Sequence, residues 1–177
     1  IRYNNDDNVV YYSDGSSWKK ISSTLAVLSS VSGDIYVAAA STLTLAGTGF
    51  LASNLVVNFA QSSDSIDVDV TVTPTSDTAA SVAVPSSVYD NVTSGNVVIV
   101  KVTNAEGNDS AGVNKTAAAL PTGGTITTSG SYRIHTFTSS GTFGNTLSSK
   151  SVEYVIVAGG GGVGGRRHGG GGGAGGY

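Results

Sequence analysis

Alternation of apolar and polar residues with a period of two runs through the middle of the chain. It is clearest at 66–72, where two sets of residues take opposite faces: Ile66, Val68, Val70 and Val72 against Asp67, Asp69 and Thr71. This period is that of a half-buried β-strand. Further runs predict strands at 41–47, 55–59, 80–84 and 96–103, with a closing strand at 110–114. Six or seven strands in about 90 residues predict an immunoglobulin-like β-sandwich over 23–116.

The first 22 residues have a shorter rhythm of strands and polar turns. Apolar and aromatic runs at 1–3, 9–12 and 18–21 are separated by an Asn/Asp-rich segment and by a second turn that contains Asp14-Gly15. Asn, Asp and Gly accept the backbone conformations of tight turns. We predict a β-hairpin module over 1–22 with Trp18 as a structural residue. A unit of this size buries too little surface to fold alone, so we expect it to depend on repetition or oligomerisation.

Glycine separates the end of the chain from the rest. Of the 25 glycines, thirteen fall between Gly159 and Tyr177. We interpret 117–131, with its Leu120-Pro121 and Gly123-Gly124 pairs, as a linker. Strands at 132–137 and 152–158 are predicted to open a module over 132–177 that runs into the glycine-rich tract. The tract cannot build a core, and we expect it to be either disordered or extended against neighbours, with no α-helix.

Composition agrees with an all-β chain and excludes several functions. Charged residues make up 12 %, the net charge is −3, and there is no Cys or Met. The acidic balance argues against nucleic-acid binding, and the missing Cys excludes disulfides, Cys-ligated zinc and a thiol nucleophile. No apolar run approaches about 18 residues, so no membrane span is expected. Because the chain has no Met, we expect it to be a segment of a longer protein.

Few residues offer candidate chemistry. Gly159–Gly164 follows a predicted strand and formally matches Gly-x-Gly-x-x-Gly, but a dinucleotide site needs a helix there, which a glycine tract does not form. His135 and His168 are isolated and do not suggest a catalytic triad; His135 is expected on a solvated strand face. Three acidic residues near one strand do not wrap a calcium ion as a loop would: Asp64, Asp67 and Asp69. We predict no enzyme activity, cofactor or metal site.

Two segments of the chain resemble known families. Residues 1–21 resemble a short module of bacteriophage tail fibres and related virion proteins, through Ile-Arg-Tyr-Asn, a polar turn, an aromatic strand and Gly-Ser-Ser-Trp-Lys. Leu43–Phe50, Pro85 after a strand and Val98–Gly107 are similar to the IPT/TIG family of immunoglobulin-like domains. That second resemblance implies turn conformations at Gly47 and Gly49, and burial of Phe50 between the sheets.

The third resemblance covers Tyr132–Tyr177. Its strands and Gly-rich tract are similar to the start of the glycine-rich module of phage tail-fibre and tail-tip proteins, and the module is truncated here. Together the resemblances imply a phage tail fibre on the virion, extracellular, assembled as a homo-oligomer, expected to be a trimer, with other tail proteins as partners. Two alternatives stay open: a bacterial surface adhesin or stalk with immunoglobulin-like spacers, and a secreted hydrolase whose catalytic part lies outside this segment.

Recognition at the tip would fall to the few side chains of the glycine-rich tract: Arg166, Arg167, His168 and Tyr177. Arg can form two parallel hydrogen bonds to a carboxylate or phosphate, and Tyr can stack on the face of a sugar ring. We expect these residues to contact a host-surface glycan, another receptor or a neighbouring chain, with the tract nearest the host and the N-terminal hairpin nearer the particle. The alternative is that the tract serves only for packing.

Overall fold

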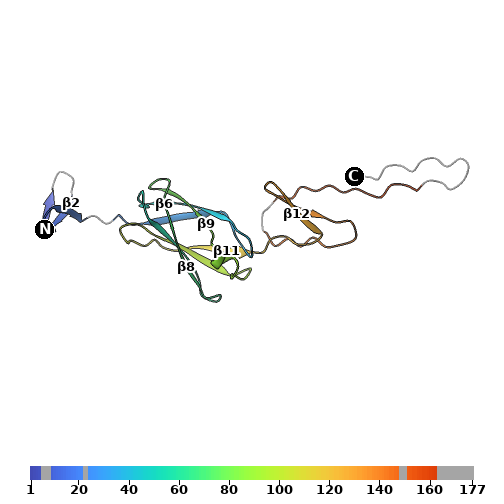
Figure 1. The fold of residues 1–177 in the computed structure, drawn as a ribbon, viewed down its shortest axis with the longest axis horizontal. Helices are drawn as coiled ribbons and strands as arrows, with labels where there is room; N and C mark the ends of the chain where they lie inside the picture. The colour runs from blue at the N-terminus through green and yellow to red at the C-terminus, as the bar shows by residue number, and fades with distance from the viewer. Residues whose placement is uncertain (5–8, 22–23, 148–150, 163–177) are drawn as a thin grey trace, which may run out of the picture. The chain divides into compact units, whose positions relative to one another are not determined.

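The computed structural model describes residues 1–4, 9–21, 24–147 and 151–162 (Figure 1). Strands dominate these residues, and the four-residue α1 (Ser86–Tyr89) is the one α-helix among them. The predicted all-β class is therefore confirmed. The chain divides into two units, 1–147 and 148–177, which are described separately.

Residues 2–21 form a three-stranded antiparallel sheet in the order β1-β2-β3: β1 (Arg2–Asn4), β2 (Val9–Ser13) and β3 (Trp18–Ile21). The turn predicted at Asp14-Gly15 joins β2 to β3, with Gly15 at φ 95°. Asp14 Oδ1 accepts hydrogen bonds from the backbone N–H groups of Ser16 and Ser17 at 2.9 and 2.8 Å. Trp18 is half exposed, with the Arg2 guanidinium 5.9 Å from its ring centroid.

Two facing sheets build the immunoglobulin-like sandwich (Figure 1). The first has the order β4-β6-β9: β4 (Val27–Ser32), β6 (Thr42–Thr48) and β9 (Ala79–Ala83). The second has the order β5-β11-β10-β7-β8: β5 (Ile35–Tyr36), β11 (Val113–Ala118), β10 (Val97–Thr103), β7 (Leu55–Gln61) and β8 (Ile66–Val72). All pairs are antiparallel except β5 with β11.

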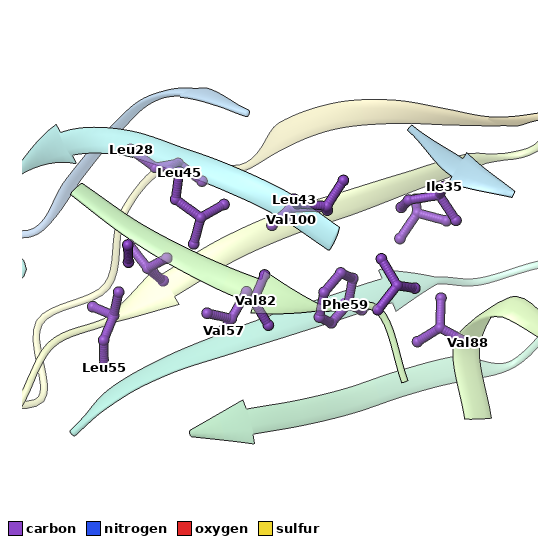
Figure 2. Close-up of a cluster of buried hydrophobic side chains, with 14 of the residues drawn as sticks. Leu28, Ile35, Leu43, Leu45, Leu55, Val57, Phe59, Val82, Val88 and Val100 are labelled. Atoms are coloured by element: carbon purple, nitrogen blue, oxygen red, sulfur yellow. The ribbon is translucent and has the colours of Figure 1, made fainter. Parts of the chain in front are cut away.

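Apolar side chains from both sheets meet between them (Figure 2). Buried and open positions alternate along β6, β7 and β10, as the period of two predicts. The largest wholly buried side chains include Phe50, Phe59, Leu43, Leu45 and Leu55. In β8 the predicted faces are confirmed, since Ile66 is buried, Val68, Val70 and Val72 are partly buried, and Asp67, Asp69 and Thr71 are exposed.

The closing strand lies later in the chain than the sequence pattern predicted. It is β11, Val113–Ala118, instead of 110–114, so the sandwich continues past residue 116 into the expected linker. The Ala117 N–H donates to the Asn96 carbonyl at 2.9 Å, and the Ala117 carbonyl accepts from the Gly95 N–H at 2.8 Å. Ala117 is buried, but alanines carry little apolar signal, and their run resembled a spacer.

A second strand also lies within the predicted linker, 117–131. Residues Thr125–Ser129 form β12, which pairs antiparallel with β13 (Tyr132–Thr136), while Gly130 at φ 58° turns the chain between them. The strand predicted at 132–137 is thereby confirmed, and the linker prediction is wrong for 125–129. Every residue of β12 is exposed, so no alternating pattern marked it in the sequence.

The strand predicted at 152–158 is absent. The structure describes 151–162 without a strand, and Val152, Tyr154, Val155, Ile156 and Val157 are 57–84 % exposed. A β-branched segment favours a strand, but a strand also needs a partner to pair with. In the described part of the chain, no helix has the length and apolar character to cross a membrane.

Candidate functional site

The chain enters the sandwich through a clamp around Thr24. The carbonyl of Thr24 accepts a hydrogen bond from Asn104 Nδ2 at 2.6 Å, and its N–H donates to Glu106 Oε2 at 2.6 Å. Asn104 is 3 % exposed and also donates to the Gly49 carbonyl at 2.9 Å. Its Oδ1 accepts from the backbone N–H groups of Glu106 and Asn108. One buried amide thus ties the incoming chain to two turns of the sandwich.

The chain leaves the sandwich at the other end. After β11, the Ala119 N–H donates to Ser94 Oγ at 3.1 Å, and the Ala118 carbonyl accepts from the Val37 N–H at 3.0 Å. Ser94 precedes β10, whereas Asn104 follows it, so β10 separates the two attachment points. Its seven residues span roughly 20 Å. The sandwich therefore carries the chain from one of its ends to the opposite end.

The Gly-x-Gly-Phe element partly follows the prediction. Phe50 is wholly buried, and Gly49 has φ 70°, so both of these expectations are confirmed. Gly47 is not in a turn, because it lies within β6. It is glycine for a different reason: a Cβ there would lie 1.9 Å from the Val27 carbonyl oxygen and 2.7 Å from Phe50 Cζ.

Asp77 fixes the same element from the segment before β9. Its Oδ2 accepts from the Gly49 N–H at 3.2 Å and its Oδ1 from the Leu51 N–H at 3.1 Å. The Asp77 carbonyl accepts from the Phe50 N–H at 3.1 Å. Sequence reasoning missed Asp77, because a single acidic residue in a polar turn gives no signal of a partner 26 to 28 residues away.

The acidic residues near β8 make structural contacts. Asp64 accepts from the Thr93 N–H at 2.9 Å, from Thr93 Oγ1 at 3.0 Å and from Asn96 Nδ2 at 3.0 Å. The backbone hydrogen bond from Thr93, followed by that from Asn96, lowers the pKa of Asp64 below its ordinary value. Asp67 and Asp69 share Asn58 Nδ2, at 2.7 and 2.8 Å. In the residues that the structure describes, no three His, Cys, Asp or Glu side chains group as metal ligands would.

His135 does not lie on a solvated face, contrary to the sequence expectation. It is half-buried, its Nδ1 is 2.8 Å from the Gly123 carbonyl oxygen, and its ring meets Phe143 edge-on with 5.0 Å between the centroids. Its Nε2 is buried without a hydrogen-bond partner. The loop after β13 therefore covers this face of the β12–β13 sheet, and a Cβ on Gly141 would lie 3.0 Å from Phe137.

The opposite face of the β12–β13 sheet is open. Tyr132 and Ile134 project from it and are 64 % and 42 % exposed. The segment Val152–Val157, in the other unit, is a separate stretch of exposed apolar side chains. Contiguous apolar exposure marks interaction sites. Each of the two is therefore a candidate assembly surface, and the described residues show no candidate catalytic centre.

All four predicted contact residues lie outside the described residues: Arg166, Arg167, His168 and Tyr177. The expectation of no helix over 159–177 reaches into the described part only at 159–162, which has no regular structure. Comparisons of the chain with protein-family models, with curated proteins and with solved structures found no match. The function is therefore inferred from the fold, its surfaces and the sequence resemblances.

Proposed function

We propose that this chain is a structural protein of a virion, a phage tail fibre that extends from the particle and displays a host-recognition tip. The observation that supports this most is the path of the chain through the sandwich, which begins at the Thr24 clamp and ends beside Ser94. A module with attachment points at opposite ends adds length to a fibre.

The chemistry of the surface is compatible with this role. The acidic side chains of β8 accept hydrogen bonds from Asn58. Since β8 is an edge strand of the sandwich, these charges disfavour its pairing with a strand of another chain. The small sheet β1-β2-β3 has no buried side chain at 1–3 and 10–18, where the structure describes burial, and β12–β13 has two strands only. A two-stranded sheet is below the size that is stable alone, and a three-stranded unit of about 20 residues buries too little surface to fold alone. Both features support a homo-oligomer, proposed to be a trimer.

The proposed partners follow from the resemblances. Other tail proteins would hold the N-terminal part, and the glycine-rich tract would face a host-surface glycan through Arg166, Arg167, His168 and Tyr177. The proposed location is the outside of the virion. An adhesin or stalk on a bacterial surface is the second candidate, because a sandwich with opposite attachment points also serves as a spacer there.

Immunogold electron microscopy separates the two candidates. An antibody raised against the whole chain is applied to purified particles and to the surface of uninfected cells of the same strain. Label on tail fibres, with none on the bare cells, is the expected result. Label on uninfected cells and none on particles would contradict the virion assignment and favour the adhesin. Antibody pre-absorbed with the chain is the matched control.

A further inference from the structure

The segment Val152–Val157 has the residue types of a β-strand but pairs with no sheet among the described residues. Its side chains are apolar except for Glu153, and its five apolar side chains are more than half exposed. A strand that is apolar on both faces is expected to be covered on both faces. At on the order of 100 Å² for each side chain, the segment exposes about 500 Å² of apolar surface per copy, enough for a specific interface when two copies contribute.

The β12–β13 sheet has an unpaired strand edge and an exposed apolar face. In the described part of the chain, β12 and β13 pair only with each other, so the outer edge of β13 is open. Tyr132 and Ile134 leave one face of this sheet exposed. A sheet of two strands is marginal in water, and a third strand with a shared apolar face brings it to the size that is independently stable. Adding an extended segment to an open edge is a common mode of recognition.

A pair of opposite charges indicates the register between β13 and the segment Val152–Val157. β13 carries Arg133 and the segment carries Glu153, and neither has an ion-pair partner among the described residues. If the strands run parallel with these two residues adjacent, Val152 lies beside Tyr132 and Tyr154 beside Ile134 on the open face. The antiparallel register with the same charge pair would carry Val155, Ile156 and Val157 past the start of β13. The parallel register carries only Val157 past the end of β13, so it buries more.

A second copy fits this role better than the same chain. Residues 137–144 already cover the His135 face, Gly144 pairs with Thr122, and Thr146 Oγ1 donates to the Ala119 carbonyl at 2.6 Å. Within one chain, the described residues 151–162 form no strand and pair with no strand edge. Association of copies makes the contact more than once, because each copy brings one segment and one open edge.

We propose that Val152–Val157 of one copy adds as a third, parallel strand to the outer edge of β13 of a second copy, with Glu153 beside Arg133. The inference rests on the homo-oligomer of the proposed function and assigns its contact. Two copies that exchange segments, or a closed ring of three, both satisfy this pairing.

Cysteine cross-linking of the whole chain tests the contact, since the natural chain has no cysteine. Ile134→Cys protein is mixed with Tyr154→Cys protein under mild oxidation, and the mixed disulfide dimer is measured by non-reducing gel and mass spectrometry. Adjacent strand positions lie within disulfide reach. The matched control replaces Ile134→Cys by Thr128→Cys, on β12 and the other face of the sheet. We expect about tenfold more mixed dimer from the 134–154 pair than from the control.

A charge exchange provides the second arm. Glu153→Arg and Arg133→Glu should each weaken association in light scattering, and the double variant should restore it. Cross-linking equal to the control in a chain that is still oligomeric would overturn the strand addition and leave the homo-oligomer standing. Cross-linking only when both cysteines are in one chain would overturn the second copy as occupant. A monomeric natural chain would overturn both the homo-oligomer and this contact, while the virion assignment is still decided by immunogold.

Discussion

The ring of Phe50 lies against the backbone of Gly47, so close that a Cβ at residue 47 would be 2.7 Å from Phe50 Cζ. On the other side, the same Cβ would meet the carbonyl oxygen of Val27 in β4 at 1.9 Å. Gly47 therefore lets β4, β6 and the buried ring approach one another. This close approach, and not a turn, is why the Gly-x-Gly-Phe element begins with glycine.

Gly47→Ala should destabilise the sandwich by about 1–3 kcal/mol, because one of the two atoms in the way belongs to backbone and cannot rotate aside. Urea unfolding followed by fluorescence or circular dichroism measures the change. Gly159→Ala is the matched control, since a Cβ there meets nothing within 4 Å. Equal stability of the two variants would show that β4 can move away from residue 47 at no cost.

Phe50→Ala should cost about 3–5 kcal/mol, because the side chain is wholly buried between the sheets and its removal leaves a cavity. The same unfolding experiment measures it. Val97→Ala provides a comparison on the outer face of β10, where the side chain is 41 % exposed and the loss should be well below that of Phe50. A Phe50→Ala variant as stable as Val97→Ala would contradict the assigned role of Phe50 in the core.

Local patterns predicted the sandwich well where burial alternates. β8 lies where its alternation placed it, and the wholly buried Phe50 follows the resemblance to immunoglobulin-like domains. The pattern failed where side chains are small or exposed, as at Ala117 in β11 and throughout β12. It failed in the other direction at 152–158, where suitable residues have no strand to pair with in the described part of the chain.

Asn104→Ala should destabilise the chain by about 2–4 kcal/mol, because it leaves the buried Gly49 carbonyl without its side-chain donor and removes the acceptor of two backbone N–H groups. Hydrogen exchange should also quicken at Thr24, since its Glu106 contact depends on the same turn. Asn114→Ala, at an exposed position of β11, is the control. Unchanged exchange at Thr24 would mean that Asn104 does not hold the incoming chain.

The polar contacts could not be predicted because they join distant parts of the chain. The turn at 104–107 was expected from its Asn and Gly, but its hydrogen bond to Thr24 crosses 80 residues. Asp64 reaches Thr93 across 29 residues in the same way. For His135 the sequence predicted exposure to solvent, because it alternates with Arg133 along one strand. The prediction was wrong because the loop that places Phe143 against the His135 ring has no sequence signature.

Asp64 should make stability depend on pH in the acid range. Its pKa in the folded chain is lowered, chiefly by the hydrogen bond from the Thr93 N–H, so its contribution is present above the unfolded value of 3.8 and is lost as the pH falls through the lower folded value. Asp64→Asn should flatten this part of the profile in urea unfolding between pH 7 and pH 2. A profile unaltered by Asp64→Asn would contradict the assignment.

Replacement of Arg166, Arg167 and His168 by Ser in the full-length protein should weaken adsorption of particles to host cells, if these residues read a receptor. Hydrogen bonds to charged groups contribute about 1.5–3 kcal/mol each, so losing even one corresponds to roughly a tenfold change in affinity or more. Adsorption rate measures this, with Lys101→Ser, on the exposed side of β10, as a control for loss of positive charge elsewhere on the chain. Assembly is checked by electron microscopy before the comparison. Normal adsorption by correctly assembled triple-variant fibres would remove the recognition role and leave the tract only a packing role.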